Sequence, residues 1–439
     1  MPRIVLVGAG SVEFTRNLLG DFLSYPELRD AEVVLHDIDA DRLATAERMA
    51  RWTADALGAA PTIRGSLDRR EALQGADFVI DTIQVGGARA TQLDFDVPGR
   101  YGLRYTINDT INVGGVLRGL RSIPVVLGIV ADMAEVCPDA LFLNYTNPMG
   151  MLVRAVDEAI GLPTVGLCHS VYWTVHTLAG YLDVPFEEVT AESAGVNHLA
   201  WVTRLEHRGI DLYPALGAFI GSGLAPDDDL VRADLFRRFG LYPTESSEHH
   251  AEYNPWFIPK GDLVERLHIP IGEYLDRVAH NLDEYADTKR RLDAGEGFEI
   301  ERSGEYAAVI VHSMLTGEPS RIVANVPNDG GRLIPNLAGD ACVEVPALVD
   351  ALGVHPVAVA PLPPHCAAYT RPAVDTQELT VRAALDEDRD LVYHAVLTDP
   401  QVQARLTLDE AWRMTDELIA AEAEWLPEWL GGSAPDPMS

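Results

Sequence analysis

The first 185 residues alternate short apolar runs with helix-like segments, and this alternation limits the possible folds more than any other feature of the chain. The runs expected to form strands are 3–7, 31–37, 61–64, 76–83, 140–145 and 163–167. The segments expected to form helices are 13–24, 41–57, 68–74, 116–136 with an interruption near Pro124, and 150–160. Because parallel strands that are buried on both faces form continuous apolar runs, this order predicts an α/β fold with a Rossmann-like, doubly wound parallel sheet.

The pattern changes after about residue 190, where longer mixed segments begin. Helices are expected at 273–295, 303–316 and 376–430, and strands at 200–206 and 321–326. The change predicts a Rossmann-like domain at 1–190 and a mixed α+β domain for substrate, metal and oligomerisation at 191–432, packed closely on the first. Residues 433–439 are expected to form a frayed tail.

Composition limits the classes of partner and compartment. The formal net charge of −33 makes nucleic acid and anionic membranes poor partners. The chain has neither an uninterrupted apolar stretch of the roughly 18 residues that a spanning helix needs nor an N-terminal signal pattern. Its four cysteines have no CxxC pair, which is typical of free thiols. We therefore expect a cytoplasmic protein that acts on a small molecule.

The first turn, Val7-Gly8-Ala9-Gly10-Ser11, has the composition of a dinucleotide-binding loop. Gly8 and Gly10 permit a tight turn and close approach to a pyrophosphate, and the following helix offers its N-terminal amides from Ser11 onward. Glu13 stands where the GxGxxG motif has its third glycine, so the motif is incomplete. Asp37 ends the second expected strand and is suited to accept from ribose hydroxyls, which favours NAD over NADP.

Further polar residues are expected at the carboxyl edge of the sheet, where open α/β sheets bind ligands. Cys168 and His169 follow the sixth expected strand, Asn147 follows the fifth, and Asn197-His198 comes 30 residues after Cys168. A thiolate and an imidazole suit a divalent transition metal whose other positions are open to substrate and water. A packed cysteine, a satisfied core histidine and turn-capping asparagines would give the same local pattern, so the residues alone leave both interpretations open.

The segment 242–253 concentrates ionisable groups. Glu248, His249 and Tyr253 are all capable of carrying a proton in catalysis. A polar surface loop would have the same composition, so a catalytic segment and a surface loop are equally good interpretations of these residues.

Taken together, several motifs resemble glycoside hydrolase family 4. They are GAGS at 8–11, NYTNP at 144–148, CHSV at 168–171, GVNHLAW at 195–201, TESSEH at 244–249, NVPNDG at 325–330 and VEVPALVD at 343–350. They cover almost the whole chain, and CHSV together with TESSEHHAEYNPWF is similar to the α-galactosidase branch. The chain departs from the family at Asn112-Val113, where the usual sequence is Gly-Pro.

The resemblance implies an α-galactosidase that uses NAD and a divalent metal, Mn²⁺ or another. In that scheme NAD⁺ takes hydride from sugar C3, the ketone acidifies the C2 proton, a base removes it, and the aglycone leaves from C1. Water then adds and the hydride returns, so no net redox change occurs. Such enzymes are an exception to the two-carboxylate scheme of other glycosidases.

The resemblance also implies roles for single residues. Cys168 and His198 match the metal ligands, Asn147 matches a sugar-binding asparagine, and Asn197 is a second candidate for substrate binding. His169 stands where other branches have the acid that protonates the leaving oxygen. The C2 base is a tyrosine in other branches, and the candidates here are Tyr253, Glu248 and His249.

Other functions stay open at this point. α-Glucosides and α-galacturonides are alternative substrates within the same family. An NAD-dependent dehydrogenase of a small hydroxy compound would share the nucleotide loop but would not need a Cys–His metal pair, and a nucleotide sensor would bind NAD without turnover. The resemblance also predicts a homodimer or homotetramer.

Overall fold

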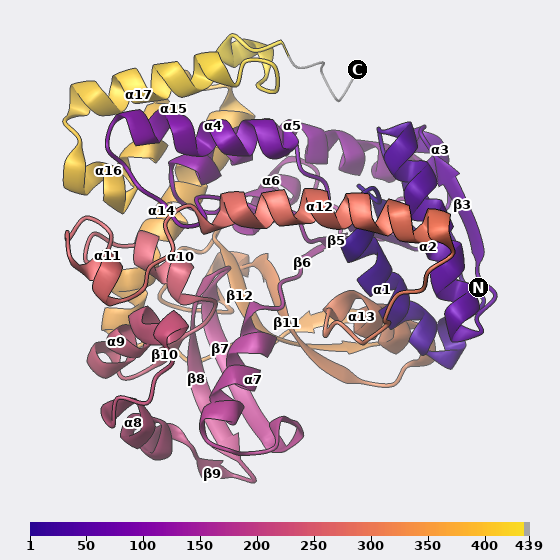
Figure 1. Cartoon of the computed structure of the whole chain (residues 1–439), viewed down its shortest axis with the longest axis horizontal. Helices are drawn as coiled ribbons and strands as arrows, with labels where there is room; N and C mark the ends of the chain where they lie inside the picture. The colour runs from indigo at the N-terminus through magenta and orange to yellow at the C-terminus, as the bar shows by residue number, and fades with distance from the viewer. Residues whose placement is uncertain (434–439) are drawn as a thin grey trace.

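The computed structural model describes residues 1–433, and within that range one continuous 13-stranded sheet runs through the molecule (Figure 1). The expected tail at 433–439 lies, apart from Ser433, outside the described residues. The sheet order is β10-β8-β7-β12-β11-β6-β5-β4-β1-β2-β3, with β13 on β12 and β9 on β8. Both halves of the chain therefore contribute to one sheet.

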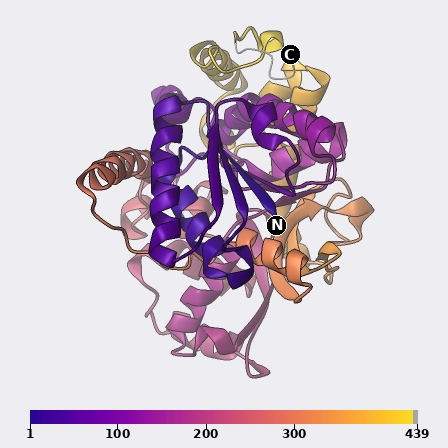
Figure 2. The same ribbon diagram turned by 90° about the vertical axis from the view of Figure 1, so that its right-hand side faces the viewer.

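The N-terminal half confirms the predicted Rossmann-like sheet. Its parallel strands are β1 (Arg3–Val7), β2 (Glu32–His36), β3 (Thr62–Ser66), β4 (Phe78–Asp81), β5 (Leu141–Asn144) and β6 (Thr164–Gly166). Their spatial order, β3-β2-β1-β4-β5-β6, is that of the dinucleotide-binding fold. Figure 2 shows helices on both faces of these strands, which include α1 (Val12–Ser24), α2 (Ala40–Leu57), α3 (Arg69–Leu73) and α6 (Met149–Ala159).

Two helices of this half differ from the sequence-based expectation. The helix α5 (Val113–Val136) passes through Pro124 without ending, although proline removes a backbone donor. Most of α5 is buried against α6 and α14, and that packing offsets the lost hydrogen bond. The helix α4 (Gly87–Arg100) was not expected, because its glycines and Pro98 weaken the helical pattern.

The helix α5 also bears on membrane partners. Among the described residues it is the one helix long and apolar enough to cross a membrane, and 83% of its most apolar window is buried inside the protein. A buried core helix of this kind meets the same criteria of length and hydropathy.

The second half adds antiparallel strands to the same sheet. They are β7 (Val189–Val196), β8 (Leu199–His207), β9 (Ile210–Asp211), β10 (Tyr242–Pro243), β11 (Ser320–Pro327), β12 (Cys342–Asp350) and β13 (Gly353–Pro356). The pair of Asn325 of β11 with Gly166 of β6 joins these strands to the parallel ones, and the pair of Glu344 of β12 with Gly195 of β7 joins two groups of antiparallel strands. The strands expected at 200–206 and 321–326 correspond to β8 and β11.

The helices of this half are partly as expected. The segments at 273–295 and 303–316 form α12 (Glu273–Ala294) and α13 (Tyr306–Thr316). The expected single helix at 376–430 is wrong: the region contains α14 (Pro364–Asp386), α15 (Arg389–Leu397), α16 (Pro400–Arg405) and α17 (Leu408–Ala421). Capping by Asp388, Asp399 and Thr407 starts the last three. The remaining helices are α7 (Ser170–Tyr181), α8 (Tyr213–Gly221), α9 (Leu230–Phe239), α10 (Ser247–Glu252) and α11 (Leu263–Arg266).

A buried ion cluster ties the C-terminal helices to the Rossmann half. Arg121 of α5 is 1% exposed and donates to Asp94 of α4 at 2.7 Å and to Glu422, which follows α17, at 2.8 Å. Burial and the nearby charge of Asp94 raise the pKa of Glu422 well above its ordinary value, although Arg121 opposes the rise. One buried guanidinium therefore serves two buried carboxyl groups.

Replacing Arg121 by Met is expected to lower the free energy of unfolding by about 3–5 kcal/mol, because it leaves Asp94 buried without its cation. The matched control is Glu422→Gln, which keeps an acceptor for Arg121 and is expected to cost less than about 1 kcal/mol. Urea denaturation followed by circular dichroism measures both values. An unchanged unfolding midpoint for Arg121→Met would contradict this account.

Candidate active site

The nucleotide loop has the geometry that the sequence predicts. Gly8 has a φ of 85°, and a Cβ added there would lie 2.9 Å from the Thr82 carbonyl carbon. The Gly10 amide donates to Asp37 Oδ2 at 2.7 Å, and a Cβ on Gly10 would lie 2.5 Å from that oxygen. Ser11 is the exposed N-cap residue of α1 and makes no side-chain capping bond. The loop thus leaves the N-terminus of α1 open to an anion.

A cleft lies beside this loop, at the carboxyl ends of β1 and β2. Its lining includes Val7, His36 and Ile83 at the carboxyl ends of their strands, and Ile38 and Leu67 on the following loops. Ile38 is 93% exposed and Leu67 is 55% exposed, so two large apolar side chains stand uncovered at this cleft. Such walls are suited to the flat faces of an adenine ring.

Cys168 and His198 meet at the other end of the parallel sheet's carboxyl edge. The Cys168 Sγ atom lies 3.4 Å from His198 Nε2. Cys168 follows β6, and His198 lies in the two-residue turn between β7 and β8. His198 has a φ of 62°, a left-handed conformation that side chains of this size adopt at a cost in free energy. A strained residue aimed at a thiol indicates a functional constraint.

Hydrogen bonding fixes the tautomer of His198. Thr110 Oγ1 lies 2.7 Å from Asp109 Oδ1 and 3.1 Å from His198 Nδ1. Burial raises the pKa of Asp109, but the ion pair with His249 and the charge of Arg118 outweigh burial and hold it below its ordinary value. The single Thr110 proton therefore goes to the Asp109 carboxylate, and the Thr110 oxygen accepts from His198 Nδ1–H. The lone pair of His198 Nε2 is left facing Cys168, as a metal ligand requires.

The charges around this pair favour a bound cation. Burial raises the pKa of Cys168 well above its ordinary value, and Glu245 and Glu344 add to the rise. Burial lowers the pKa of His198 to about 4, so its imidazole is neutral. The ligand atoms of Cys168, His198 and Glu245 all lie within 4.8 Å of one another. A divalent cation fits this donor set, since it would offset the thiolate and the carboxylate together.

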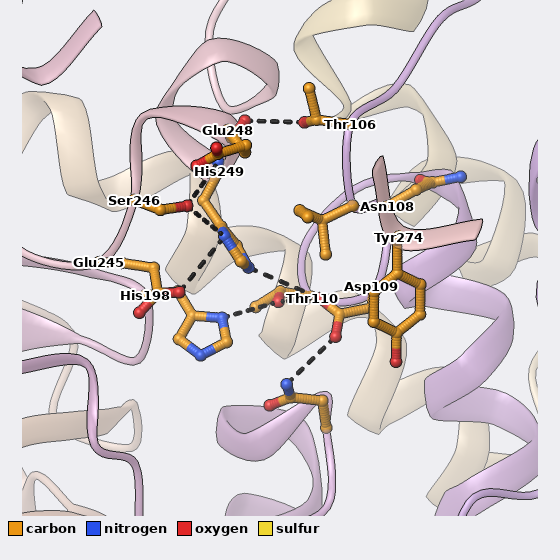
Figure 3. A network of polar contacts seen from close by, with 12 residues as sticks. Thr106, Asn108, Asp109, Thr110, His198, Glu245, Ser246, Glu248, His249 and Tyr274 are labelled. Atoms are coloured by element: carbon orange, nitrogen blue, oxygen red, sulfur yellow. Dashed lines mark hydrogen bonds and ion pairs between the residues drawn. The ribbon is translucent and has the colours of Figure 1, made fainter. Parts of the chain in front are cut away.

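His249 lies next to His198, Glu245 and Asp109 (Figure 3). Its ring packs edge-on against His198 with centroids 4.5 Å apart, and its nitrogens lie 3.5 Å from Glu245 and 3.8 Å from Asp109. Burial lowers the pKa of His249, but the two carboxylates outweigh burial and raise it to about 9. His249 is thus a buried cation between two carboxylates and also belongs to a second potential ligand group, Asp109–His198–His249.

The other predicted residues are distributed as follows. Asn147 donates to Asp109 Oδ2 at 3.2 Å, which brings it into the same network. Asn197 is buried in the β7–β8 turn beside His198. His169 has a side chain that is 51% exposed, and its Nδ1 lies 2.6 Å from Glu305 Oε1. Burial lowers the pKa of His169, but the hydrogen bond and charge of Glu305 outweigh burial and raise it.

The three candidate bases differ in their surroundings. Glu248 joins the network through its backbone carbonyl, which accepts from Thr106 Oγ1 at 2.7 Å. Tyr253 is 5% exposed and packs edge-on against His249, and its buried hydroxyl has no hydrogen-bond partner by the usual distance and angle criteria. Burial, followed by the charge of Glu252, raises the pKa of Tyr253 well above its ordinary value. His249 already holds a proton between its carboxylates.

A different tyrosine faces this network and was missed by sequence reasoning. Tyr274, in the first turn of α12, accepts from Arg118 Nη1 at 2.9 Å, and Arg118 lies 3.9 Å from Asp109 Oδ2. Figure 3 shows Tyr274 beside Asp109. Asp109, Thr110 and Glu245 were also missed as functional residues, although Glu245 lies within TESSEH and the other two lie just before the departure at Asn112-Val113. A hydroxyl that forms its partnership with an arginine 156 residues away has no local signal in the sequence.

The departure at Asn112-Val113 leaves the loop intact. Asn112 Nδ2 and the Val113 amide donate to Asp399 Oδ2 at 3.3 and 2.9 Å. The retained glycines are the sterically demanding positions: a Cβ would lie 2.3 Å from Asn108 O at Gly114 and 2.4 Å from Thr110 C at Gly115. The start of α5 therefore keeps its close contact with the site.

A Rossmann-type sheet with an open nucleotide loop and a thiol–imidazole pair at one edge defines a dinucleotide- and metal-dependent enzyme. Family 4 glycosyl hydrolase matches residues 3–184, and the family 4 glycosyl hydrolase C-terminal domain matches residues 193–402. The chain belongs to glycosyl hydrolase family 4.

The relatives and solved structures cover nearly the whole chain. An α-galactosidase of Bacillus subtilis is 40% identical over 433 residues, covering 98% of this chain and 100% of that protein. An α-galactosidase of Rhizobium meliloti is 37% identical, covering 97% and 89%. A 6-phospho-α-glucosidase from gut microorganisms, solved in complex with NAD and Mn²⁺, has a TM-score of 0.82 at 20% identity over 97% of this chain and 99% of that one, which shows a shared fold.

Replacing Thr110 by Val is expected to weaken Mn²⁺ binding by about 10- to 100-fold, because the acceptor that orients His198 is lost. Thr110→Ser keeps the hydroxyl and serves as the matched control, with affinity close to that of the unchanged protein. Isothermal titration calorimetry with MnCl₂ measures both. Equal affinities for the Val and Ser variants would show that the hydrogen bond does not orient the ligand.

Proposed function

We propose that this chain hydrolyses α-galactosides by transient oxidation at sugar C3, elimination of the aglycone, addition of water and re-reduction. The observation that carries the proposal is the Cys168–His198 pair, 3.4 Å apart with the lone pair of Nε2 toward the thiol, at the carboxyl edge of a nucleotide-binding sheet. Family membership supports the reaction class, and the two α-galactosidase relatives, 40% and 37% identical, support the substrate class.

The residues of the chain fit both accessory groups. Gly8, Gly10, Ser11 and Asp37 would hold NAD, and Cys168 and His198 would hold Mn²⁺. When bound, NAD supplies a reversible hydride acceptor for C3, and the metal supplies a Lewis acid for the oxygens next to it. Asn147 would bind a sugar hydroxyl, since its amide is already fixed by Asp109. Asn197, next to His198, is retained as a second substrate contact.

We infer that Tyr274 is the base that removes the C2 proton. Arg118 donates to the Tyr274 oxygen, and a positively charged donor stabilises negative charge on its acceptor. Tyr274 is half-buried and therefore reachable by substrate, whereas the Tyr253 hydroxyl is enclosed. Glu248 and His249 stay as weaker candidates, because the first takes part in the network through its backbone and the second holds a shared proton.

His169 is the proposed acid for the leaving oxygen. Its side chain is half-exposed at the start of α7, directly after the ligand Cys168. Glu305 accepts from Nδ1 at 2.6 Å, which leaves Nε2 as the nitrogen that would carry the transferred proton. The arrangement would allow His169 to protonate an oxygen on the solvent side of the sugar.

We further propose that residues 1–190 bind the nucleotide, that 191–432 form the catalytic and oligomerisation part, and that the protein is a cytoplasmic homodimer or homotetramer. The four free cysteines are compatible with a reducing compartment. Sedimentation equilibrium of the purified protein decides the oligomeric state.

The substrate proposal is tested with nitrophenyl glycosides. The purified protein is expected to release nitrophenol from the α-galactoside when Mn²⁺, NAD⁺ and a thiol reductant are present, and to lose that activity after chelation and removal of NAD⁺. The α-glucoside and the α-galacturonide are the comparison substrates. Full activity without metal and nucleotide would refute the mechanism. A preference for another glycoside would assign that glycoside as the substrate in place of the α-galactoside. Steady net formation of NADH from a hydroxy acid would instead indicate a dehydrogenase.

The assignment of the base is tested by comparing two tyrosines. Tyr274→Phe is expected to reduce kcat by about 10²- to 10⁴-fold and to abolish deuterium incorporation at C2 of galactose produced in D₂O, because the proton acceptor is lost. Tyr253→Phe is the matched control and is expected to retain both kcat and deuterium incorporation. Deuterium at C2 is measured by NMR of the product, and the NAD⁺ affinity of each variant is measured alongside it. The reverse result would assign the base to Tyr253.

A further inference from the structure

The face of α7 that continues from His169 is aromatic and exposed. Trp173 donates its backbone amide to the His169 carbonyl at 3.0 Å, so the two residues are one helical turn apart. Trp173 is 46% exposed, and the His169 side chain is 51% exposed. The inward positions Val171, Thr174 and Val175 are buried, so the solvent face of this turn is defined by the exposed pair.

Neighbouring rings hold Trp173 in place. Tyr172 and His176 pack against it edge-on with centroids 5.2 and 5.3 Å away. Phe186 in turn contacts both Tyr172 and His176, at 4.9 and 5.3 Å. A single exposed apolar residue is normal on a protein surface, but an exposed indole held by two rings, which a third ring supports, is pre-organised to present its free face.

The loop that positions the acid packs on the same cluster. Glu305 accepts from His169, and a single residue separates it from Ser303, whose amide donates to Asp21. Gly304 between them has a φ of 79°, and a Cβ there would lie 3.0 Å from the Tyr172 ring. The rings and the His169–Glu305 pair thus form one connected surface at the start of α7.

From this placement we propose that Trp173 is a stacking platform for the sugar ring of the leaving group, so that the substrates are α-galactosyl oligosaccharides. The inference rests on the proposed function. An acid that protonates the glycosidic oxygen touches the atom that joins the two sugars, so the aglycone lies on the solvent side of His169. The first large side chain on that side along α7 is the indole of Trp173. The C–H face of a pyranose packs well on such a ring, and the exposed imidazole of His176 offers a polar partner.

The platform is tested with two α-galactosides that both need an acid and differ in the aglycone. One is the disaccharide with glucose as aglycone, and the other is methyl α-galactoside, which has no ring to stack. Trp173→Ala is expected to lower kcat/KM about tenfold for the disaccharide, the factor that about 1.4 kcal/mol of stacking corresponds to, and to leave the methyl glycoside unchanged. Trp173→Phe is expected to recover most of the loss.

A matched control and the contrary outcomes keep the test decisive. Trp412 on α17 is 36% exposed and stacks on Tyr393, so Trp412→Ala removes a comparable exposed indole outside the site and is expected to change neither substrate. Equal losses for both substrates in Trp173→Ala, or no loss for the disaccharide, would overturn the platform while leaving the proposed function standing. If the unchanged protein hydrolyses neither α-galactoside, the proposed function itself fails, and the platform fails with it.

Discussion

The site depends on two places where the backbones of neighbouring strands approach closely. The N-terminal sheet meets the antiparallel strands through the pair Gly166–Asn325, and β7 meets β12 through Gly195–Glu344. At Gly166 a Cβ would lie 2.5 Å from Met149 Sδ, and at Gly195 it would lie 2.4 Å from the Ala200 Cα. Gly166 precedes Cys168 by two residues and Gly195 precedes His198 by three. A side chain at Gly166 would push against α6 and β11, and one at Gly195 would push β7 away from β8, so the meeting of Cys168 and His198 depends on two positions without a side chain.

The charge distribution around that pair is balanced without any of the groups being exposed. Asp109 and Glu245 are carboxylates, and His249 and Arg118 are the cations next to them. Burial raises the pKa of Glu245, but the histidines around it (His198 once protonated at low pH, His249 and His169) outweigh burial and lower it to about 2. Glu344, behind Asn197, has a pKa that burial raises to about 8 and is therefore neutral. Formation of a thiolate at Cys168 would upset this balance unless positive charge arrives with it, which couples deprotonation to occupation of the site.

The parts that sequence reasoning predicted are those whose signal is local. Continuous apolar runs identified the parallel strands, and the rule that ligands bind at strand carboxyl ends directed attention to Cys168, His169 and Asn147. The structure brings Cys168 and His198 together as the motifs suggested. Tyr274 could not be found in this way, because its significance comes from contact with Arg118, far away in sequence. Two errors about helices have related causes. The helix α5 continues through Pro124 because its burial overrides the low helix propensity of proline. The region 376–430 divides into several helices because capping residues such as Asp388 begin a new helix.

The surface helix α12 joins two functions across the molecule. Of its residues only Thr288 is buried, and its first turn carries Tyr274. Near its far end Lys289 contacts Asp41 at 2.6 Å. The Tyr285 ring packs on the Arg42 guanidinium, which donates to the Gly10 carbonyl. Lys289 is one of only two lysines in the chain, with Lys260. A reagent specific for primary amines therefore finds very few targets, and one of them, Lys289, lies at the contact between α12 and α2. The extent of acylation at the Lys289 amine therefore measures whether α12 is packed against α2.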